Sequence, residues 1–514
     1  MTGPITEGSD FLQLRPASAP SKGLTTWLRD ALRTAIFDGR LPGGTRLPAT
    51  RTLAAELAVS RGVVVEAYQR LGDEGLVRAR TGVGTVVTAA PLAGAPASRT
   101  GSAGHRQATD QPPGDRAITD RAVDRGITDR AVGDHPAAGL RLPLPAPPHT
   151  ELDLSPGVPD LSAFPRAAWL RAERAVLDHA TSADLGYGDP RGCAALRHEL
   201  IRWLARTRGV HADADDILVV GGVAQALALL GQTLCARGRG AIAVEDPGSR
   251  GARDQLTHWG LRPVPIPVDD EGMRVEDLTG TGLDAALLTP AHQFPTGVVL
   301  SPERRIALLA WVAAGRRLII EDDYDAEHRY DRAPVAAVQA SAPDRVAYTG
   351  STSKSLAPGM RLGWLIAPRQ LHDDLTAAKH ASDLGNPALP QLVVAHLLAT
   401  GEYERHLRNV RTRQRHRRDA LLAGLRKHLP AARVEGIAAG LHLLLMLPHL
   451  AGRIDDTELA QHIAATGIFV HPLSWHRLRP GPPGLVLGYA AQTPGRLREA
   501  GRRLADAINT FQPG

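Results

Sequence analysis

One lysine, Lys354, lies in a small, hydroxyl-rich stretch at residues 350–364, together with Arg361. Lysine is scarce in this chain, and most of its basic residues are arginines. A Schiff base requires an amine that can lose its proton, which a guanidinium cannot supply. A polar turn between a strand and a helix would explain the stretch equally well. Other parts of the chain must therefore decide between a Schiff-base lysine and a simple turn.

Polar residues also follow several predicted strands further along the chain. From residue 151 onward, short β-branched runs alternate with helical stretches, which is the pattern of an α/β domain with a mostly parallel sheet. One predicted strand ends in Asp322 and Tyr324, and another continues through Gly222 into a helix whose free N–H groups suit a phosphate. Because ligands of such sheets bind at the carboxyl ends of the strands, we expect these residues to meet the Lys354 loop.

This set of groups fits the chemistry of pyridoxal phosphate. That cofactor needs a lysine for an imine, a carboxylate beside its ring nitrogen, and hydroxyls with an arginine for its phosphate. Lys354, Asp322 and Arg361 are residues of those types. The sequence therefore predicts a pyridoxal phosphate site and no metal site. For Asp322, a helix N-cap or a surface acid is the alternative.

The N-terminal residues show a second pattern, in which short helices are joined by a tight turn. Helices are expected near 24–38, 48–57 and 61–74, and strands at 76–80 and 85–87. In a helix-turn-helix, the second helix presents its first residues to the major groove of DNA. The glycine-tipped hairpin carries Arg78 and Arg80, which suit a phosphate or the minor groove. A small helical bundle with a solvated basic face is the alternative.

The composition narrows the class of protein. Of 514 residues, 43% are hydrophobic and 22% charged, and the net charge of +6 is compatible with a nucleic-acid partner. Two cysteines make no disulfide framework and indicate a reducing compartment. No signal peptide is expected, and no membrane span either, since glycine and glutamine interrupt the apolar segment 217–235. We therefore expect a cytoplasmic protein with no membrane partner.

Composition also divides the chain into segments. Between residues 89 and 150 it is rich in Gly, Pro, Ala, Ser, Asp and Arg, which predicts a flexible low-complexity linker. We expect a tail at 1–23, a DNA-binding domain at 24–88, the linker at 89–150 and a cofactor-binding domain at 151–514. The last part of that domain, from about residue 400, is expected to form a smaller α+β subdomain.

Short motifs fill residues 24–88. They are Leu47-Pro-Ala-Thr-Arg51, Leu53-Ala54, Val59-Ser-Arg61, Ala67-Tyr68, Leu71, Glu74-Gly75 and Gly82-Val-Gly-Thr85. Together they resemble the GntR-type winged helix along its whole length. The resemblance implies contacts with double-stranded DNA from Arg51, Ser60, Arg61, Gly62, Arg80, Gly82 and Gly84. That family usually has threonine near the start of the recognition helix, where this chain has Val63.

The large domain carries its own ordered motifs. They are Tyr187-Gly-Asp-Pro-Arg-Gly192, Ala291-His-Gln-Phe-Pro-Thr-Gly297, Asp322-Asp-Tyr324 and the lysine loop. Their order resembles the fold type I aminotransferases. With the winged helix in front, the chain resembles the MocR (GabR-like) transcriptional regulators over nearly all its length outside the linker. The resemblance also implies a homodimer that binds paired DNA half-sites.

The same resemblance implies a role for each site residue. Lys354 would form the Schiff base, Asp322 would pair with the pyridine nitrogen, and Tyr324 would face the ring hydroxyl. The phosphate would be held by Ser351, Ser353, Arg361 and the backbone of Gly222, Val223 and Ala224. His292 and Gln293 would lie near the cofactor, although a purely structural role is an equal alternative for His292.

Three departures from the aminotransferase pattern bear on function. Ser249 stands where an aromatic residue usually stacks on the cofactor ring, and the phosphate turn lacks its usual hydroxyl. The last strand, at 484–489, has no arginine to clamp a substrate carboxylate, and Arg477 and Arg479 are poor substitutes. We therefore expect a pocket that holds the cofactor more than it processes an amino acid.

These observations leave three functions to be compared. The first is a regulator that senses pyridoxal phosphate itself, similar to the PdxR branch that controls vitamin B6 synthesis. The second is a regulator that senses an amino acid or amine through an external aldimine. The third is an active aminotransferase with an accessory domain, which the missing arginine and the fused winged helix disfavour. At most, residual transaminase activity is expected.

Overall fold

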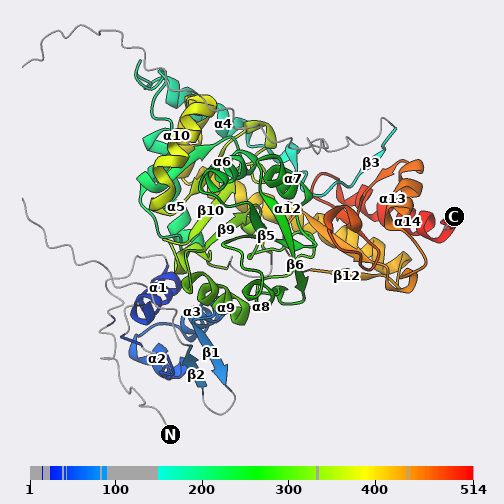
Figure 1. Cartoon of the computed structure of the whole chain (residues 1–514), viewed down its shortest axis with the longest axis horizontal. Helices are drawn as coiled ribbons and strands as arrows, with labels where there is room; N and C mark the ends of the chain where they lie inside the picture. The colour runs from blue at the N-terminus through cyan, green and yellow to red at the C-terminus, as the bar shows by residue number, and fades with distance from the viewer. Residues whose placement is uncertain are drawn as a thin grey trace, which may run out of the picture.

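The computed structural model describes residues 14, 23–37, 40–41, 43–80, 84–88, 149–330, 335–436 and 439–512. Figure 1 shows a small N-terminal domain in blue, a central α/β domain, and a C-terminal part in orange and red. The expected tail and linker lie almost entirely outside the described residues. Among the helices that are described, none is long and apolar enough to span a bilayer.

The N-terminal domain is a winged helix-turn-helix. Its elements are α1 (Leu24–Phe37), α2 (Thr50–Glu56), α3 (Arg61–Asp73), β1 (Val77–Arg80) and β2 (Gly84–Val87). Leu28 and Leu32 of α1 and Val64 and Leu71 of α3 are fully buried, because their helical spacing places them on inward faces. The two strands pair antiparallel and form the wing.

An eight-stranded sheet forms the centre of the large domain, in the order β4-β11-β10-β9-β8-β5-β6-β7. The strands are β4 (Ile217–Val220), β5 (Ala241–Asp246), β6 (Arg262–Asp269), β7 (Gly272–Met273), β8 (Ala285–Leu288), β9 (Leu318–Asp323), β10 (Val346–Ser351) and β11 (Gly363–Ile366). The run from β10 to β6 is parallel, whereas β11 is antiparallel to both of its neighbours. The prediction of an α/β domain with a mostly parallel sheet is confirmed.

Helices cover both faces of this sheet. They are α4 (Arg166–Leu177), α5 (Ala194–Arg208), α6 (Val223–Ala236), α7 (Arg250–His258), α8 (Glu276–Thr279), α9 (Pro302–Ala313), α10 (His372–Asp383) and α11 (Ala388–Ala399). Alternate residues of β4 enter different cores, because successive side chains of a strand point to opposite faces. Ile217 and Val219 pack with α5 and α11, and Leu218 and Val220 pack with α6.

The C-terminal part is a smaller α+β unit. Its elements are α12 (Glu402–His428), β12 (Arg433–Glu435), β13 (His442–Met446), α13 (Asp456–Ala465), β14 (Ile468–Phe469), β15 (His471–Pro472), β16 (Gly484–Gly488) and α14 (Pro494–Thr510). β12, β13, β16 and β15 form an antiparallel sheet, and β3 (Leu152–Asp153) pairs with β14. α12 begins in the core of the central domain with Tyr403 and ends in the C-terminal core with Leu425.

Candidate functional site

The ends of neighbouring strands bring the predicted cofactor residues to one edge of the sheet. Asp322 on β9 lies opposite Thr349 on β10, with 3.5 Å between its carboxylate oxygen and the threonine hydroxyl. The Lys354 loop follows β10, and the Gly222 turn follows β4. β11 lies between β4 and β10, and a Cβ on its Gly363 would come within 2.9 Å of the Gly222 Cα. Lysine loop, acid and glycine turn therefore meet as expected from their strand-end positions.

Lys354 is largely buried against a backbone carbonyl. Its Nζ donates a hydrogen bond to the oxygen of Gly157 at 2.6 Å. Burial lowers the pKa of Lys354, while the charges of Asp325 and Asp322 act in the opposite direction. Gly157 has φ of +81°, and a Cβ there would come within 3.1 Å of Nζ. Gly157 is thus a contact of the lysine that reasoning from the sequence missed.

Asp322 has an unusual affinity for protons. Burial, followed by the charges of Asp323 and Asp325, raises the pKa of Asp322 from 3.8 to about 7. A raised pKa means that the folded protein holds this proton more tightly than the unfolded chain does. The carboxyl group can therefore change its charge near neutral pH, depending on what lies beside it.

This proton gives the chain a measurable pH dependence. Between pH 3.8 and about 7, the folded state keeps a proton on Asp322 that the unfolded state has lost, so stability falls as pH rises. Asp322→Asn should make the pH slope of the free energy of unfolding shallower by up to about 1.4 kcal/mol per pH unit in that window. Melting temperatures of the cofactor-free protein from pH 5 to 7 would measure it. The exposed Asp374→Asn is the control, and an equal slope in both variants would contradict the expectation.

Tyr324, His292 and Asp325 form a compact polar group close to Asp322. The Nδ1 of His292 lies 3.0 Å from the Tyr324 hydroxyl oxygen and 2.9 Å from Asp325 Oδ2. Asp325 is only 2% exposed and His292 only 4%. Burial, then the charges of Asp325 and Asp322, raises the pKa of Tyr324 well above its usual value, so the phenol stays protonated. Asp325 is a second residue that the sequence did not single out.

Gln293 fixes its own loop. Its Nε2 donates to the carbonyls of Pro247 at 2.9 Å and Phe294 at 2.6 Å. Its Oε1 accepts from the Thr296 backbone N–H at 3.1 Å and from the Thr296 hydroxyl at 2.6 Å. The buried amide therefore ties the 291–297 turn to the segment at Pro247.

The predicted phosphate residues come from the first turn of α6, from the end of β10 and from the loop after β10. They are Gly222, Val223, Ala224, Ser351, Ser353 and Arg361. Gly222 has φ of +98°, and a Cβ there would lie 3.4 Å from each terminal nitrogen of the exposed Arg361 guanidinium. The first backbone N–H groups of a helix have no intrahelical acceptor, and with a guanidinium beside them they suit an anion. The Ser351 hydroxyl is 3.3 Å from the Ser353 backbone nitrogen, from which it accepts a hydrogen bond.

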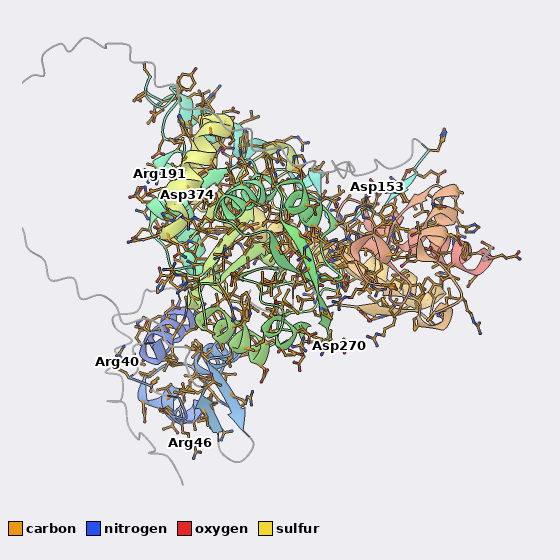
Figure 2. All side chains as sticks on the ribbon, in the orientation of Figure 1. Arg40, Arg46, Asp153, Arg191, Asp270 and Asp374 are labelled. Atoms are coloured by element: carbon orange, nitrogen blue, oxygen red, sulfur yellow. The ribbon has the colours of Figure 1, made fainter. Side chains whose placement is uncertain are left out.

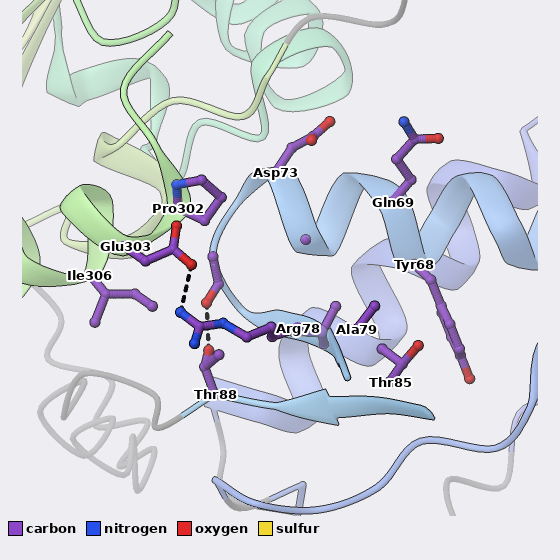
Figure 3. A pocket seen from close by; sticks show the side chains of 13 residues that line it. Tyr68, Gln69, Asp73, Arg78, Ala79, Thr85, Thr88, Pro302, Glu303 and Ile306 are labelled. Atoms are coloured by element: carbon purple, nitrogen blue, oxygen red, sulfur yellow. Dashed lines mark hydrogen bonds and ion pairs between the residues drawn. The ribbon is translucent and has the colours of Figure 1, made fainter. Parts of the chain in front are cut away.

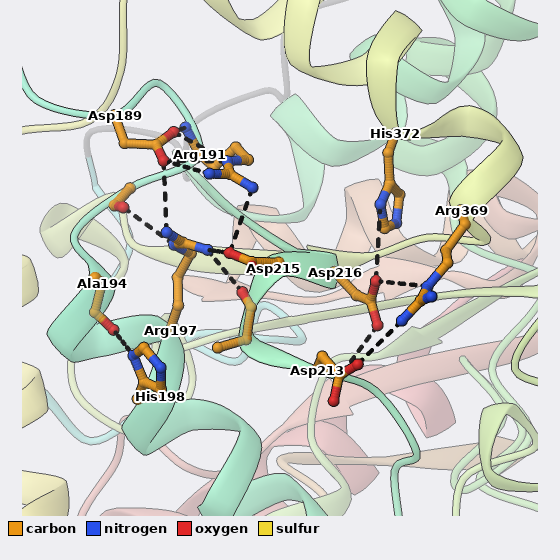
Figure 4. Close-up of polar contacts among 12 residues, drawn as sticks. Asp189, Arg191, Ala194, Arg197, His198, Asp213, Asp215, Asp216, Arg369 and His372 are labelled. Carbon is orange, nitrogen blue, oxygen red and sulfur yellow. Dashed lines mark hydrogen bonds and ion pairs between the residues drawn. The ribbon is translucent and has the colours of Figure 1, made fainter. Parts of the chain in front are cut away.

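A network of arginines and aspartates holds the 187–192 motif (Figure 4). Asp189 accepts from Arg191 at 2.7 Å and from Arg197 at 3.4 Å, and Arg197 also donates to Asp215 at 2.9 Å. The network fixes the turn that leads into α5. Tyr187, at the start of this motif, is 89% exposed, which is unusual for so large an apolar residue.

The predicted DNA-binding residues lie at exposed positions of the winged helix. Arg51 lies in the first turn of α2, and Ser60, Arg61 and Gly62 stand at the start of α3. Gly84 begins β2 and is exposed. The predicted contacts Gly82 and the side chain of Arg80 lie outside the described residues.

Two further residues of this domain clarify its surface. Arg46 forms a β-bridge with Val86, and its Nε lies 3.2 Å from the position of a Cβ on Gly84. Figure 2 shows Arg46 at the end of the domain remote from the central sheet. The sequence did not single it out as a DNA contact. Val63, which stands where threonine is usual, packs partly buried against the domain core, which accounts for an apolar residue there.

Both halves of the chain match known families. Residues 24–87 match the bacterial regulatory proteins of the gntR family, and residues 150–504 match aminotransferase class I and II. The chain is 30% identical to the probable rhizopine catabolism regulatory protein MocR of Rhizobium meliloti, over 94% of this chain and 93% of the relative. The chain belongs to the MocR-type transcriptional regulators.

Other relatives agree with this membership. The pyridoxine biosynthesis regulator PdxR of Corynebacterium glutamicum is 30% identical over 96% of this MocR-type chain and 97% of its own length. Among solved structures, the kynurenine aminotransferase of Pyrococcus horikoshii superposes with a TM-score of 0.64 at 26% identity, covering 70% of this chain and 90% of that enzyme. The fold type I character of the large domain is thereby confirmed.

The departures noted in the sequence have structural counterparts in this MocR-type chain. Ser249 caps α7, with its hydroxyl accepting from the Ala252 backbone N–H at 3.3 Å. In β16, Leu485 is fully buried in the C-terminal core. Arg477 donates to the carbonyl of Pro482, and Arg479 donates to that of Pro265 at 3.1 Å. Backbone carbonyls, one in a loop and one in β6, thus accept hydrogen bonds from the two guanidinium groups that precede the last strand.

Proposed function

We propose that this MocR-type regulator binds pyridoxal phosphate as its effector, and that the bound cofactor changes its affinity for operator DNA. The observation that carries the proposal is the largely buried Lys354 amine, which shares one sheet edge with Asp322 and the Arg361–Gly222 pair. We also propose vitamin B6 synthesis as the regulated process. Its support is the similarity over nearly the whole chain to a regulator named for pyridoxine biosynthesis.

The residues present fit this cofactor. Gly157 and Gly222 leave open the space beside the Lys354 amine and the Arg361 guanidinium that a side chain would fill. Pyridoxal phosphate, when bound, supplies an aldehyde for the lysine amine, a basic ring nitrogen and a phosphate. Lys354 would hold the aldehyde carbon and Asp322 the ring nitrogen. Arg361, with the N–H groups of the first α6 turn, would hold the phosphate.

The surrounding residues prepare the pocket for that group. Because burial lowers the pKa of Lys354, more of the amine is neutral and nucleophilic than on an exposed lysine. Asp322 can ionise beside a protonated ring nitrogen, since its pKa of about 7 lies near neutral pH. The His292–Asp325 pair holds the Tyr324 hydroxyl in place, where it would face the ring hydroxyl.

The environment of the last strand favours sensing over turnover. An aminotransferase binds its substrate carboxylate with a bidentate arginine, which is the strongest contact available for that group. Here Leu485 is buried in β16, and Arg477 and Arg479 each donate a hydrogen bond to a backbone carbonyl. A response to an amino acid or amine, and residual transaminase turnover, are therefore treated as alternative outcomes of the test.

We propose that the protein acts as a homodimer on paired half-sites. Leu170 and Leu177 of α4, and Leu185 and Tyr187 in the segment after it, are large apolar side chains exposed to solvent. Exposed apolar surface of this kind is what a partner subunit covers. Mixing the chain with a longer, tagged copy should give a protein–DNA complex of intermediate mobility. Two bands without an intermediate would argue for a monomer.

A gel shift on the protein's own upstream DNA, with and without pyridoxal phosphate, tests the proposed function. Operator affinity should change when the cofactor is added, whereas Arg61→Ala should weaken DNA binding by about 1–3 kcal/mol and leave the cofactor's absorbance intact. If affinity ignores pyridoxal phosphate and responds only to an added amine, the amine-sensing alternative replaces this one. Transamination at ordinary enzyme rates, about 1–1000 per second, would instead favour an aminotransferase.

A further inference from the structure

The winged helix is docked on the central domain through a face that contains buried charges. In Figure 1 α3 of the winged helix lies beside α9 at the lower edge of the sheet. Arg33 of α1 is only 6% exposed, and its Nη2 donates to the carbonyl of Ala340 at 2.6 Å. Its Nη1 lies 3.4 Å from the carbonyl oxygen of Gly209. One guanidinium from the DNA-binding domain thus joins two segments of the cofactor-binding domain.

Both domains are shaped for this contact. Gly209 has φ of +66°, and a Cβ there would come within 2.7 Å of Arg33 Nη1. On the other side, Gly75 follows α3 with φ of +76°, and its Cβ would come within 2.8 Å of the carbonyl oxygen of Pro302 in α9. A side chain at Gly75 would collide with the backbone of α9, and a side chain at Gly209 would displace the Arg33 guanidinium. Such close approach indicates a specific interface.

The edge of the interface is more open. Arg78 on the wing pairs with Glu303 of α9, and both side chains are exposed (Figure 3). Beside this pair lies a cavity of about 380 Å³ between α3, the wing and α9. Exposed pairs of this kind contribute little to stability. The buried Arg33 contact, and not the exposed pair, is therefore expected to determine docking.

A continuous row of buried charges leads from Arg33 toward the cofactor site. Glu74, at the end of α3, lies 3.6 Å from Arg33 and interacts electrostatically with Arg305 of α9. Arg305 is 1% exposed, donates to the carbonyl of Ala336 at 3.0 Å, and also interacts with Glu321 of β9. Glu321 directly precedes Asp322 in that strand.

The two carbonyls that Arg33 contacts are tied to the same strand. The Glu321 carboxylate accepts the backbone N–H groups of Val338 and Gln339, each at 3.0 Å, immediately before Ala340. Arg208, the neighbour of Gly209, donates to Asp323 at 2.6 Å with both side chains buried. The carboxylates on either side of Asp322 therefore hold the two segments that Arg33 joins.

We infer that Arg33 couples the cofactor pocket to the DNA-binding domain. It contacts the carbonyls of Gly209 and Ala340, and these lie in the two backbone segments that Asp323 and Glu321 hold in place. The inference rests on the proposed function, since it requires that pyridoxal phosphate binds beside Asp322. Binding of a charged ring there changes the electrostatic balance among Glu321, Asp322 and Asp323. The backbone segments that Glu321 and Asp323 hold then move with these carboxylates. The carbonyls of Ala340 and Gly209, which bind Arg33, move as well.

The arrangement also allows the winged helix to separate from the central domain. Arg33 and Glu74 both belong to the winged helix, so their ion pair persists when the domain separates. On the other side, Arg305 keeps its interaction with Glu321. Undocking therefore does not split the buried Arg33–Glu74 pair, and splitting a buried pair is the costly outcome. A docked and an undocked state of comparable free energy are what coupling between two sites requires.

Operator affinity measured with and without pyridoxal phosphate tests this inference. The ratio of the operator affinity with the cofactor to the affinity without it is the coupling factor, which is typically about 5–150 for allosteric pairs. In Arg33→Lys the charge beside Glu74 remains, but a lysine cannot span two carbonyls. We expect that factor to fall to about one, with the cofactor's absorbance unchanged. By reciprocity, the effect of operator DNA on cofactor affinity should be lost to the same extent.

Two further variants make the result decisive. Gly209→Ala alters the contact with Arg33 from the side of the cofactor-binding domain and leaves the winged helix unchanged. It should therefore also remove the coupling. Arg78→Ala breaks only the exposed pair with Glu303 and should retain it. Coupling that survives in both Arg33→Lys and Gly209→Ala would overturn the inference. A wild-type protein whose operator affinity ignores pyridoxal phosphate would overturn the proposed function instead.

Discussion

Lys354→Ala is expected to abolish covalent attachment of pyridoxal phosphate and the visible absorbance that accompanies it. No other described lysine can replace it: Lys379 is paired with Asp383, and Lys427 lies exposed on α12. The cofactor-dependent change in operator affinity should disappear with it. Spectra of the protein after incubation with pyridoxal phosphate, followed by borohydride reduction and mass measurement, would quantify the attachment.

Matched variants separate chemistry from folding in that experiment. Lys354→Arg keeps a positive charge in the pocket but cannot form an imine, so it too should lose the band. Lys427→Ala should retain full attachment, because that side chain is remote in sequence and exposed. Attachment at any other lysine in the Lys354→Ala protein would refute the assignment of the site.

Arg208→Met is expected to cost the largest amount of stability. Arg208 is 1% exposed, and its Nε donates to Asp323 Oδ2 at 2.6 Å. The Tyr348 hydroxyl donates to the same carboxylate, but it brings no opposite charge. Removing one partner of a buried ion pair leaves the other as an unpaired buried charge. This lowers the free energy of unfolding by about 3–5 kcal/mol. Urea unfolding of the cofactor-free protein would measure the loss.

Comparison variants test the physical reason. Arg237→Met breaks the exposed pair with Asp374 and should cost about 0–1 kcal/mol. Adding Asp323→Asn to Arg208→Met should recover part of the lost stability, because a buried amide needs no counter-charge. If the single variant and the Arg237 control lose similar amounts, the buried pair is not a major contributor.

Much of the candidate cofactor site could be predicted because it follows from local patterns. Asp322 lies at the end of a recognisable strand, Lys354 and Gly222 follow shortly after two others, and parallel strands place their carboxyl ends together. The winged helix was equally accessible, since its helices and hairpin show clear periodicity in a short segment. The roles expected for individual site residues came from family resemblance, because hydrophobic periodicity indicates helices and strands but not chemistry.

Other parts could not be predicted, because they depend on distant contacts. Gly157 touches Lys354 across 197 positions in sequence, and no local pattern marks it. Arg33 reads as one more polar residue on an amphipathic helix until its two carbonyl partners are seen. The hydrogen bond from Gln293 to the carbonyl of Pro247, 46 positions away, also could not be read from the sequence.

The long helix α12 has a mechanical consequence. Its 27 residues extend for about 40 Å at 1.5 Å per residue, as one uninterrupted rod. Near its start, Tyr403 bonds the Ser355 hydroxyl of the lysine loop at 2.7 Å. Near its end, Gly424 packs so tightly on α14 that a Cβ would meet the Arg498 oxygen at 2.9 Å. Because α12 is continuous and held at both ends, a small displacement of the lysine loop would tilt the whole C-terminal part as a lever does.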